Sequence, residues 1–396
     1  MAGSAFTRRE FLIGASAALG SLALGCSLSE IATPTPSLTP PPSPTPTPSP
    51  TRSPSPSATA PPLPLRRRSA RLLVAGFRGR ALAADDPILR AIADDGLGGV
   101  ILFARNIESP AQLAELTATL RAAAGERPLL VAIDQEGGAV ARLNEANGFA
   151  ATPSAAQVGR RGDRDGAWEV GRSIASTLAG VGINLNLAPV VDLNVNPENP
   201  SIGSIGRSYS ADPDVVVEMA GAFVEGHREH GVLTALKHFA GLGSATGDTD
   251  REFVDVSDTW TEIELDPFRR LIEGGRADLV MVGNAFNDQL DPRHPASLSV
   301  PTLRVLREDL GWGGVVITDD LMAGALHENY DQSEVLRLAI SAGCDLLLLA
   351  NTGRRPGDVV QPALDAIVRL VDDGRLDERL IDQSLARIDA LFARSD

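Results

Sequence analysis

The chain has 396 residues, of which 36 are basic and 51 acidic, so its formal net charge at pH 7 is −15. Residues 69–396 alone carry 30 basic and 49 acidic side chains, a net charge of −19. So acidic a surface repels phosphate groups, which excludes nucleic acid as a partner. The apolar content of 43% is ordinary for a globular enzyme, and two cysteines are too few for a disulfide framework.

Residues 1–26 have the features of an export signal. The twin-arginine pair Arg8-Arg9 precedes an apolar run, 12–24, that is too short to span a bilayer. The run ends at Cys26, where a lipoprotein signal is cleaved and the new terminal cysteine acylated. We therefore expect export by the twin-arginine route and a cell-surface or periplasmic-side lipoprotein. A plain secretory signal is the alternative, because Ala23 stands where lipoprotein sites usually carry Leu.

Residues 27–68 have the composition of a tether. The stretch 33–64 holds 14 of the 28 prolines of the chain, alternating with Thr and Ser. Such a segment has no apolar surface to bury and stays extended and disordered. We expect it to link the lipid anchor to the folded domain.

From residue 69 onward, short apolar runs alternate with segments of helical periodicity. The runs are nearly continuous in Val, Ile, Leu and Ala, which is typical of parallel strands buried on both faces. They are 72–76, 99–103, 129–133, 183–191, 233–239, 279–282, 314–318 and 345–349. Eight strand–helix units predict an α/β fold, a single-domain (β/α)8 TIM barrel over residues 69–396.

Helical periodicity fills the gaps between these strands. The helical ranges include 110–124, 164–181, 213–230, 262–273, 301–309 and 334–342. The alternative fold is an open, doubly wound sheet that binds a dinucleotide. It is disfavoured because no GxGxxG sequence follows the first strand.

Polar residues follow most of the predicted strands. The catalytic groups of a (β/α)8 barrel lie at the carboxyl ends of its strands, so these residues are candidates for one site. They are Arg105, Asn106, Asp134, Gln135, Glu136, Asp192, Lys237, His238, Asn284, Asp319 and Asp320.

Lys237 stands out among the basic residues, because the other 35 are all Arg. Arg would serve wherever positive charge is enough, so the single Lys indicates a place that requires a compact ammonium donor. Two histidines, His227 and His230, lie three residues apart in a predicted helix and are expected at the surface.

The carboxylates suggest the chemistry. Asp319 follows the strand 314–318, and Asp248 and Asp250 lie in the Gly-, Ser- and Thr-rich loop after the strand 233–239. Two carboxylates across a barrel mouth, with cationic donors for hydroxyl groups, are typical of glycoside hydrolysis. No Ser-His-Asp order or Cys nucleophile competes, and His and Asp are not grouped as metal ligands. We expect neither a metal nor a cofactor.

Seven sequence runs resemble, in order, motifs of glycoside hydrolase family 3, in particular of its single-barrel bacterial β-N-acetylglucosaminidases (β-N-acetylhexosaminidases). The runs cover about residues 70–350 and are GGVILFARN, AIDQEGGAVARL, LAPVVDLN, SIGRSYS, LKHFAGLG, GDTD and VVITDDLM. The resemblance implies that Asp319 is the nucleophile that forms a glycosyl-enzyme. It also implies which residues hold the hydroxyl groups of the terminal sugar: Asp134, Arg142, Arg207, Lys237 and His238.

The chain departs from the family at the element that transfers the proton. The family loop carries an acid/base His two residues after an Asp partner. Here Asp248 stands at the partner position and Asp250 at that of the His, while Leu242 and Asn284 replace two other histidines. If Asp250 is the acid, its pKa must lie well above the usual ~3.9, raised by Asp248, Asp319 and desolvation.

Three functions remain open from the sequence. The first is a retaining β-N-acetylhexosaminidase that acts on cell-wall-derived or other glycans. The second is a catalytically weak or silent lipoprotein that binds glycan through the sugar site, and the third is a glycosidase of a non-aminosugar. In each, the partner is a carbohydrate and the membrane is reached only through the lipid anchor; the sequence leaves the oligomeric state open.

Overall fold

The computed structural model describes residues 63–352 and 357–394. The predicted signal peptide, Cys26 and most of the predicted tether lie outside these ranges, so their assignments stay predictions. Each of the eight predicted strands is present within the described residues, in whole or in part.

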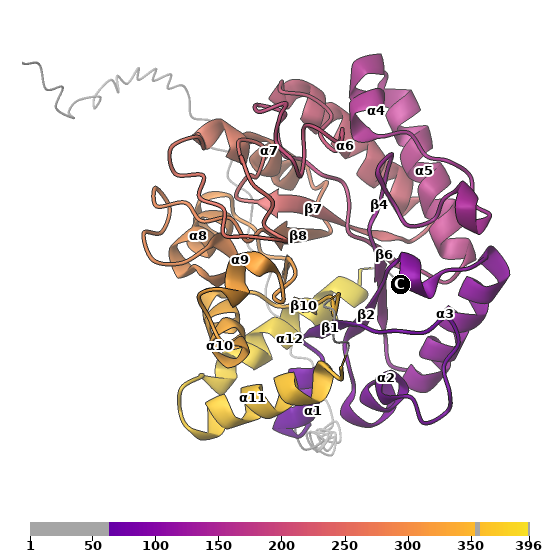
Figure 1. Ribbon diagram of the computed structural model, residues 1–396, viewed down its shortest axis with the longest axis vertical. Coiled ribbons are helices and arrows are strands. Elements are labelled where there is room, and N and C mark those ends of the chain that lie inside the picture. The colour runs from indigo at the N-terminus through magenta and orange to yellow at the C-terminus, as the bar shows by residue number, and fades with distance from the viewer. Residues whose placement is uncertain (1–62, 353–356, 395–396) are drawn as a thin grey trace, which may run out of the picture. The chain divides into compact units, whose positions relative to one another are not determined.

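Eight parallel strands form a barrel (Figure 1). They are β1 (Leu73–Gly76), β2 (Gly99–Leu102), β3 (Leu130–Ile133), β6 (Leu185–Asn186), β7 (Leu233–Phe239), β8 (Leu279–Val282), β9 (Val315–Thr318) and β10 (Leu347–Leu349). Hydrogen-bonded neighbours follow the order β10-β1-β2-β3-β6-β7-β8-β9, and a parallel bridge between Ile317 and Leu346 joins β9 to β10. The sheet closes on itself, which confirms the predicted TIM barrel.

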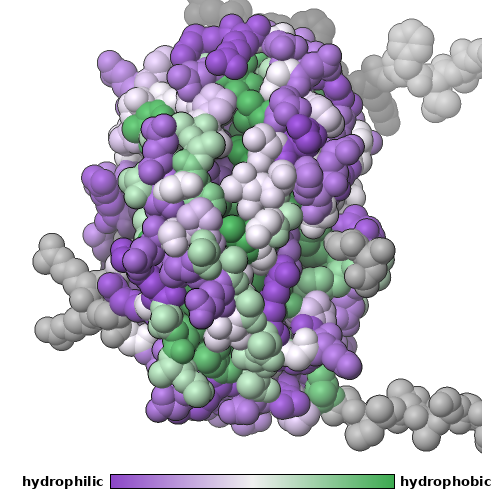
Figure 2. All heavy atoms as spheres, turned by 90° about the vertical axis from the view of Figure 1, so that its right-hand side faces the viewer, coloured by the Kyte–Doolittle hydropathy of each residue, from purple (hydrophilic) through white to green (hydrophobic). Residues whose placement is uncertain are grey.

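Helices surround the strands. The longer ones are α3 (Pro110–Ala124), α4 (Ala155–Arg161), α5 (Arg164–Gly180), α6 (Pro213–Arg228), α7 (Asp266–Glu273), α10 (Gln332–Ala342), α11 (Val360–Asp372) and α12 (Glu378–Phe392). The shorter ones are α1 (Leu65–Ala70), α2 (Pro87–Arg90), α8 (Val300–Arg304) and α9 (Gly324–His327). On the side where α3 and α5 lie, hydrophilic side chains predominate and apolar ones are interspersed among them (Figure 2). This is the surface expected of amphipathic helices with their apolar stripes turned to the strands.

Local sequence explains why the helices begin where they do. Ser109 caps α3 by accepting a hydrogen bond from the Gln112 amide, and Pro110 occupies the first turn. Asp212 and Asp331 cap α6 and α10 in the same way. Each cap satisfies an amide that has no partner within its helix.

Two predicted elements are less regular than expected. The segment 183–191 has only two residues in strand geometry, because Pro189 has no amide hydrogen to donate and the pairing resumes at a bridge between Val190 and Lys237. The segment 301–309 is the short helix α8 followed by a π-helical turn, Val305–Asp309.

A small hairpin follows β3 and was not predicted. It consists of β4 (Gln135–Gly137) and β5 (Val140–Ala141), which pair antiparallel. Gly137 and Gly138 both have positive φ angles, so glycine suits this turn. A Cβ on Gly137 would also lie 2.1 Å from the Pro153 carbonyl oxygen.

The folded domain begins earlier than the predicted boundary at residue 69, because α1 starts at Leu65. Arg66 forms an ion pair with Asp365 of α11 at 2.7 Å, and Arg68 pairs with Asp382 of α12 at 2.6 Å. Figure 1 shows α1 beside these two helices. The arginines before residue 69 therefore belong to the barrel and not to the tether.

The prediction that His227 lies at the surface was wrong. Its side chain is fully buried on α6. Its Nε2 atom lies 3.0 Å from the side-chain nitrogen Nδ2 of Asn186, and Nδ1 lies 3.0 Å from the Phe223 carbonyl oxygen. Burial lowers the pKa of His227 to about 4, so the ring is neutral near pH 7. The helix is packed on both faces in this turn, which a three-residue spacing does not reveal.

Candidate active site

The polar residues at the carboxyl ends of the strands line one open pocket of about 700 Å³. Eight residues that the sequence placed in the site line its wall: Asp134, Arg142, Arg207, Lys237, His238, Asp248, Asp250 and Asp319. Four other candidates at strand ends lie outside the lining: Asn106, Gln135, Asp192 and Asn284. Arg105, Glu136 and Asp320 line it as well. Residues of β2 and β7, and residues that directly follow β3 and β9, thus meet at one end of the barrel.

Lys237 lies at the centre of a buried ion-pair cluster. Its Nζ atom lies 2.8 Å from Asp134 Oδ1 and 2.7 Å from Glu136 Oε1, and its side chain is 3% exposed. Burial alone would lower the pKa of Lys237, but the charges of the two carboxylates outweigh it and raise that pKa. The compact ammonium group thus bridges two carboxylates, as the single lysine suggested.

Glu136 was a candidate site residue for which no role was predicted. Its carboxylate accepts two hydrogen bonds from Arg207, from Nε and Nη2, both at 2.8 Å. Burial would raise the pKa of Glu136, but Arg207 and Lys237 hold it far below its usual range. Asp134 and Glu136 both contact Lys237 Nζ. Glu136 was a candidate because it follows the predicted strand 129–133, but its pairing with Arg207 and Lys237 was not predicted.

The β4–β5 hairpin positions Arg142. Arg142 Nη2 lies 3.3 Å from Asp134 Oδ2, and its Nε atom is buried without a hydrogen-bond partner among the described residues. The Gln135 side chain fixes the hairpin by bonding the Leu143 amide and carbonyl, both at 2.9 Å. Arg142 also lines the pocket, where its guanidinium group can donate hydrogen bonds to an incoming hydroxyl group.

The pKa of Asp134 is also perturbed. Burial would raise it, but the charges of Lys237 and Arg142 lower it below its usual value. The group is ionised at neutral pH and has the acceptor capacity that sugar hydroxyl groups require.

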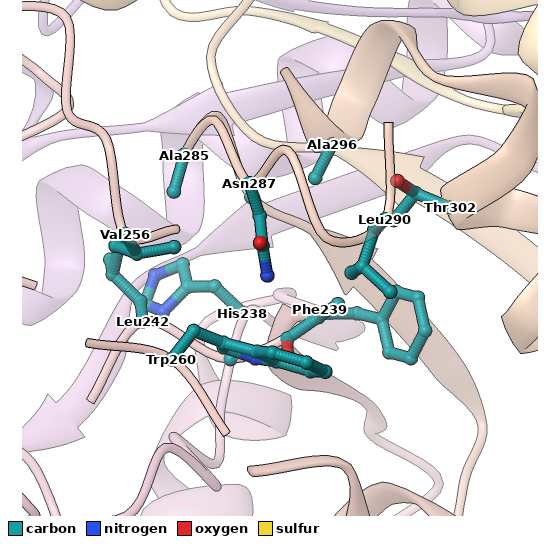
Figure 3. Close-up of a pocket in the computed structure, with 13 residues that line it drawn as sticks. His238, Phe239, Leu242, Val256, Trp260, Ala285, Asn287, Leu290, Ala296 and Thr302 are labelled. Carbon is teal, nitrogen blue, oxygen red and sulfur yellow. The ribbon is translucent and has the colours of Figure 1, made fainter. Parts of the chain in front are cut away.

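His238 is oriented by a buried carboxylate. Its Nδ1 atom lies 2.7 Å from Asp192 Oδ2, so the other ring nitrogen, Nε2, is directed toward Arg207 Nη2 at 3.4 Å. Asp192 is fully buried and also accepts the backbone amide of Leu242 at 2.9 Å. Behind His238 lies a second, small cavity of about 10 Å³, bordered by Leu242, Trp260 and other residues (Figure 3).

The opposite wall of the pocket is acidic. Asp319 follows β9, and its Oδ1 atom accepts the backbone amide of Asp320 at 2.8 Å. Asp250 is exposed to the pocket, and its backbone amide donates to Asp248 Oδ1 at 3.1 Å. Desolvation by the pocket walls, then the charge of Asp319 and that of Asp248, raise the pKa of Asp250 to about 6. This is the direction that an acid in that position needs.

Asp320, the next residue after Asp319, is largely buried in the acidic wall. It is 9% exposed, and its Oδ1 atom accepts the amides of Met322 and Ala350 at 3.0 and 2.9 Å. Burial, followed by the charge of Asp319, raises the pKa of Asp320 to about 7 despite these hydrogen bonds. Asn284 lies outside the pocket lining and bonds the Asp320 carbonyl oxygen at 2.9 Å, so its role here is structural.

The loop that carries Asp248 and Asp250, residues 240–261 and called here the β7 loop, rests on α9. The carbonyl oxygens of Thr249 and Asp250 accept the amides of Ala325 and Gly324 at 3.2 and 3.0 Å. A Cβ on Gly324 would lie 2.2 Å from the Arg251 carbonyl oxygen, so only glycine permits this contact. The tip of the loop is thereby fixed to the segment that follows Asp319.

The pocket thus combines two chemistries. One end offers ionised carboxylates and cationic donors that suit several hydroxyl groups. The other end places Asp250, with a raised pKa, beside the carboxylate of Asp319. Paired carboxyl groups with pKa values set apart by their surroundings are the arrangement that glycoside hydrolysis uses. Within 63–352 and 357–394, no three His, Cys, Asp or Glu side chains converge as metal ligands would.

Comparison with known proteins identifies relatives along most of the chain. Residues 65–391 match the family described as glycosyl hydrolase family 3 N-terminal domain. The chain is 37% identical to the β-hexosaminidase of Xylella fastidiosa strain M23 over 306 residues, 75% of this chain and 87% of that protein. It is also 37% identical to the β-hexosaminidase of Nitrosomonas eutropha over 265 residues, 64% of this chain and 74% of that protein.

Two solved structures give the same result. The family 3 β-N-acetylglucosaminidase of Paenibacillus sp. FPU-7 aligns with a TM-score of 0.77 at 37% identity, over 84% of this chain but only 63% of that one. The β-N-acetylhexosaminidase of Beutenbergia cavernae aligns with a TM-score of 0.75 at 33% identity, over 83% and 98% of the two chains. With the barrel and pocket described above, these matches show that the chain is a glycoside hydrolase and belongs to glycosyl hydrolase family 3.

Proposed function

We propose that this chain is a retaining glycosidase that removes a terminal β-linked N-acetylglucosamine, with Asp319 as nucleophile and Asp250 as acid/base. The observation that carries the proposal is the raised pKa of Asp250, about 6, beside the carboxylate of Asp319 in the same pocket. A carboxyl group with a pKa of about 6 keeps its proton up to mildly acidic pH, where an ordinary Asp is ionised, and can donate it to a leaving oxygen. The aminosugar is proposed because the aligned relatives are named β-hexosaminidase and β-N-acetylglucosaminidase.

The reaction then has two steps. In the first, an Asp319 oxygen bonds to the anomeric carbon, the glycosidic bond breaks, and the Asp250 proton passes to the leaving oxygen. In the second, Asp250 takes a proton from water, whose oxygen displaces Asp319 from the anomeric carbon. Water is thus divided between the two products, and both carboxyl groups return to their starting states.

The buried cluster supplies the binding energy for the terminal sugar. Hydroxyl groups are held by charged donors and acceptors that the fold has already oriented: Asp134, Arg142, Arg207, Lys237 and His238. Because Lys237 and its partners are already paired, few side chains need to be ordered on binding. Sugar recognition therefore costs little conformational entropy.

We also propose that the mature protein is anchored to the membrane through an acylated Cys26. The twin-arginine pair, the short apolar run and the proline-rich tether support it. In the part of the chain that the structure describes, no helix has the length and hydropathy of a membrane span. Cys26→Ser should move the protein from the membrane to the soluble fraction, and continued membrane association of that variant would refute the anchor.

The activity is tested with purified residues 63–396 and three nitrophenyl substrates: β-N-acetylglucosaminide, β-glucoside and β-xyloside. We expect turnover of the first to exceed that of the other two by at least tenfold. Preference for either neutral sugar would replace the proposed substrate. Binding of N-acetylglucosamine without turnover of any of the three would indicate a glycan-binding protein instead.

A further inference from the structure

Glu264 is a buried carboxyl group outside the pocket, and the reaction above does not use it. It lies in the 3₁₀ turn Glu262–Leu265 before α7 and is 1% exposed. Its Oε2 atom accepts the backbone amide of Gly243 at 2.8 Å, and the hydroxyl and amide of Ser244 lie close enough to stabilise the charged form of the carboxyl group. A carboxyl group buried at this cost requires an explanation.

The start of the β7 loop wraps around this carboxyl group. A Cβ on Gly241 would lie 2.6 Å from Glu264 Cβ, so the backbone approaches the side chain closely. Trp260, at the other end of the loop, donates its indole Nε1–H to the Ala240 carbonyl oxygen at 2.8 Å. Figure 3 shows the Trp260 ring near Leu242, at the edge of the small cavity behind His238. Both ends of the loop therefore meet at Glu264.

Two other residues, Asp192 and Asn199, also form hydrogen bonds with the β7 loop, but each has a further role. Asp192 accepts the Leu242 amide at 2.9 Å, but it orients His238 as well. Asn199 donates to the Leu242 carbonyl oxygen at 2.7 Å and also caps its own turn. The Glu264 carboxyl group interacts with Gly243 and Ser244, which both belong to the β7 loop. Glu264 can therefore be changed without altering a direct contact of the sugar end of the pocket.

We infer that Glu264 is a positioning residue that fixes the base of the β7 loop and thereby places Asp250 against Asp319. The loop then has two fixed points, Gly243 at Glu264 and the Thr249–Asp250 tip at α9. Releasing the base lets the tip shift, and general-acid catalysis is sensitive to displacements of a fraction of an ångström. This inference rests on the proposed role of Asp250.

The chemistry of Glu264 provides a matched pair of substitutions. Burial raises the pKa of Glu264 to about 7, so Gln is close to the protonated group in charge and shape. Gln can accept the Gly243 amide, and its NH₂ group can donate to Ser244 Oγ, which lies beside the Glu264 carboxyl group. Met fills the same volume but accepts no hydrogen bond of comparable strength. Glu262 lies exposed in the same 3₁₀ turn, so Glu262→Gln is the control.

The test compares kcat/KM for two β-N-acetylglucosaminides whose leaving groups differ. The 2,4-dinitrophenolate leaves without protonation, whereas an alkoxide needs the acid, so a misplaced Asp250 affects mainly the second substrate. We expect Glu264→Met to lower kcat/KM at least tenfold for the alkyl glycoside and less than threefold for the dinitrophenyl glycoside. Glu264→Gln and Glu262→Gln should stay within threefold of wild type on both. Gly241→Ala pushes the loop off Glu264 and should reproduce the Glu264→Met pattern even where Glu264→Met does not fold.

An equal loss of kcat/KM on both substrates would overturn the inference, because it would indicate a general structural defect. No loss on either substrate would also overturn it, because Glu264 would then not affect the position of Asp250. Asp250→Ala is measured in parallel. If Asp250→Ala discriminates between the leaving groups and neither Glu264→Met nor Gly241→Ala does, only the role of Glu264 fails. If Asp250→Ala does not discriminate, the proposed acid fails and the role of Glu264 fails with it.

Discussion

Both ends of the pocket contain acidic residues, but these residues face cations at one end and other carboxylates at the other. At the sugar end, Asp134 and Glu136 are enclosed with Lys237 and Arg207, and their pKa values fall. At the acid end, the Asp250 carboxyl group makes no hydrogen bond within the described residues, faces other carboxylates, and its pKa rises to about 6. Ion pairs fix the first end, and backbone contacts to α9 fix the second. Binding groups are thus locked in one charge state, whereas the proton-transfer group can change its own.

The largest effect should come from Asp319, the proposed nucleophile, which lies at the acid end of the pocket. Asp319→Asn removes the nucleophilic oxygen while retaining shape, so we expect kcat to fall by a factor on the order of 10³ or more. Binding of N-acetylglucosamine, measured by calorimetry, should change little. A variant that keeps a tenth of the wild-type kcat would exclude Asp319 as the nucleophile.

At the sugar end, Glu136→Gln leaves Arg207 and Lys237 partly unpaired in a buried cluster. We expect the free energy of unfolding at pH 7 to fall by about 3 kcal/mol, as measured by denaturant titration. Because the pKa of Glu136 is lower in the folded chain, its stabilisation is present above pH ~4.3 and lost as the pH falls. The difference between wild type and variant should therefore shrink on acidification; a constant difference would show that charge is not its origin.

Lys237→Arg tests the same cluster with its charge retained. The planar guanidinium cannot bridge Asp134 and Glu136 as the ammonium group does, so we expect about tenfold lower kcat/KM, or ~1.4 kcal/mol. A purely electrostatic role would leave the kinetics unchanged. The loss should fall on KM as well as on kcat, since sugar contacts are disturbed in the ground state.

The smallest expected change is at Asp250→His, which exchanges one acid for another. As the proposed acid, Asp250 can donate a proton only while it is protonated, so kcat/KM of the wild type should fall as the pH rises above about 6. A histidine in that position titrates near ~6.5 and should shift the falling limb upward, with KM nearly unchanged. An unaltered pH–rate profile would show that another group supplies the proton.

The sequence predicted several residues of the pocket but not the contacts that hold them in place. Strand ends are visible as a polar residue after an apolar run, so Asp134, Lys237 and Asp319 could be identified directly. The pairing of Glu136 with Arg207 joins residues 71 positions apart, and no local pattern contains it. The α9 contacts and the Glu264 hydrogen bond involve backbone groups of the loop, which carry no side-chain signature. His227 was misplaced because helical spacing does not show how many faces of α6 are covered.

The central claim is that Asp250 is the acid/base of a retaining reaction on Asp319, and azide tests it most directly. Azide is a small anionic nucleophile that needs no base, so it can replace water in the second step when Asp250 is absent. We expect azide to accelerate Asp250→Ala with the dinitrophenyl substrate at least tenfold and to yield the β-glycosyl azide, identified by NMR spectroscopy. No acceleration, or an α-glycosyl azide, would contradict the account.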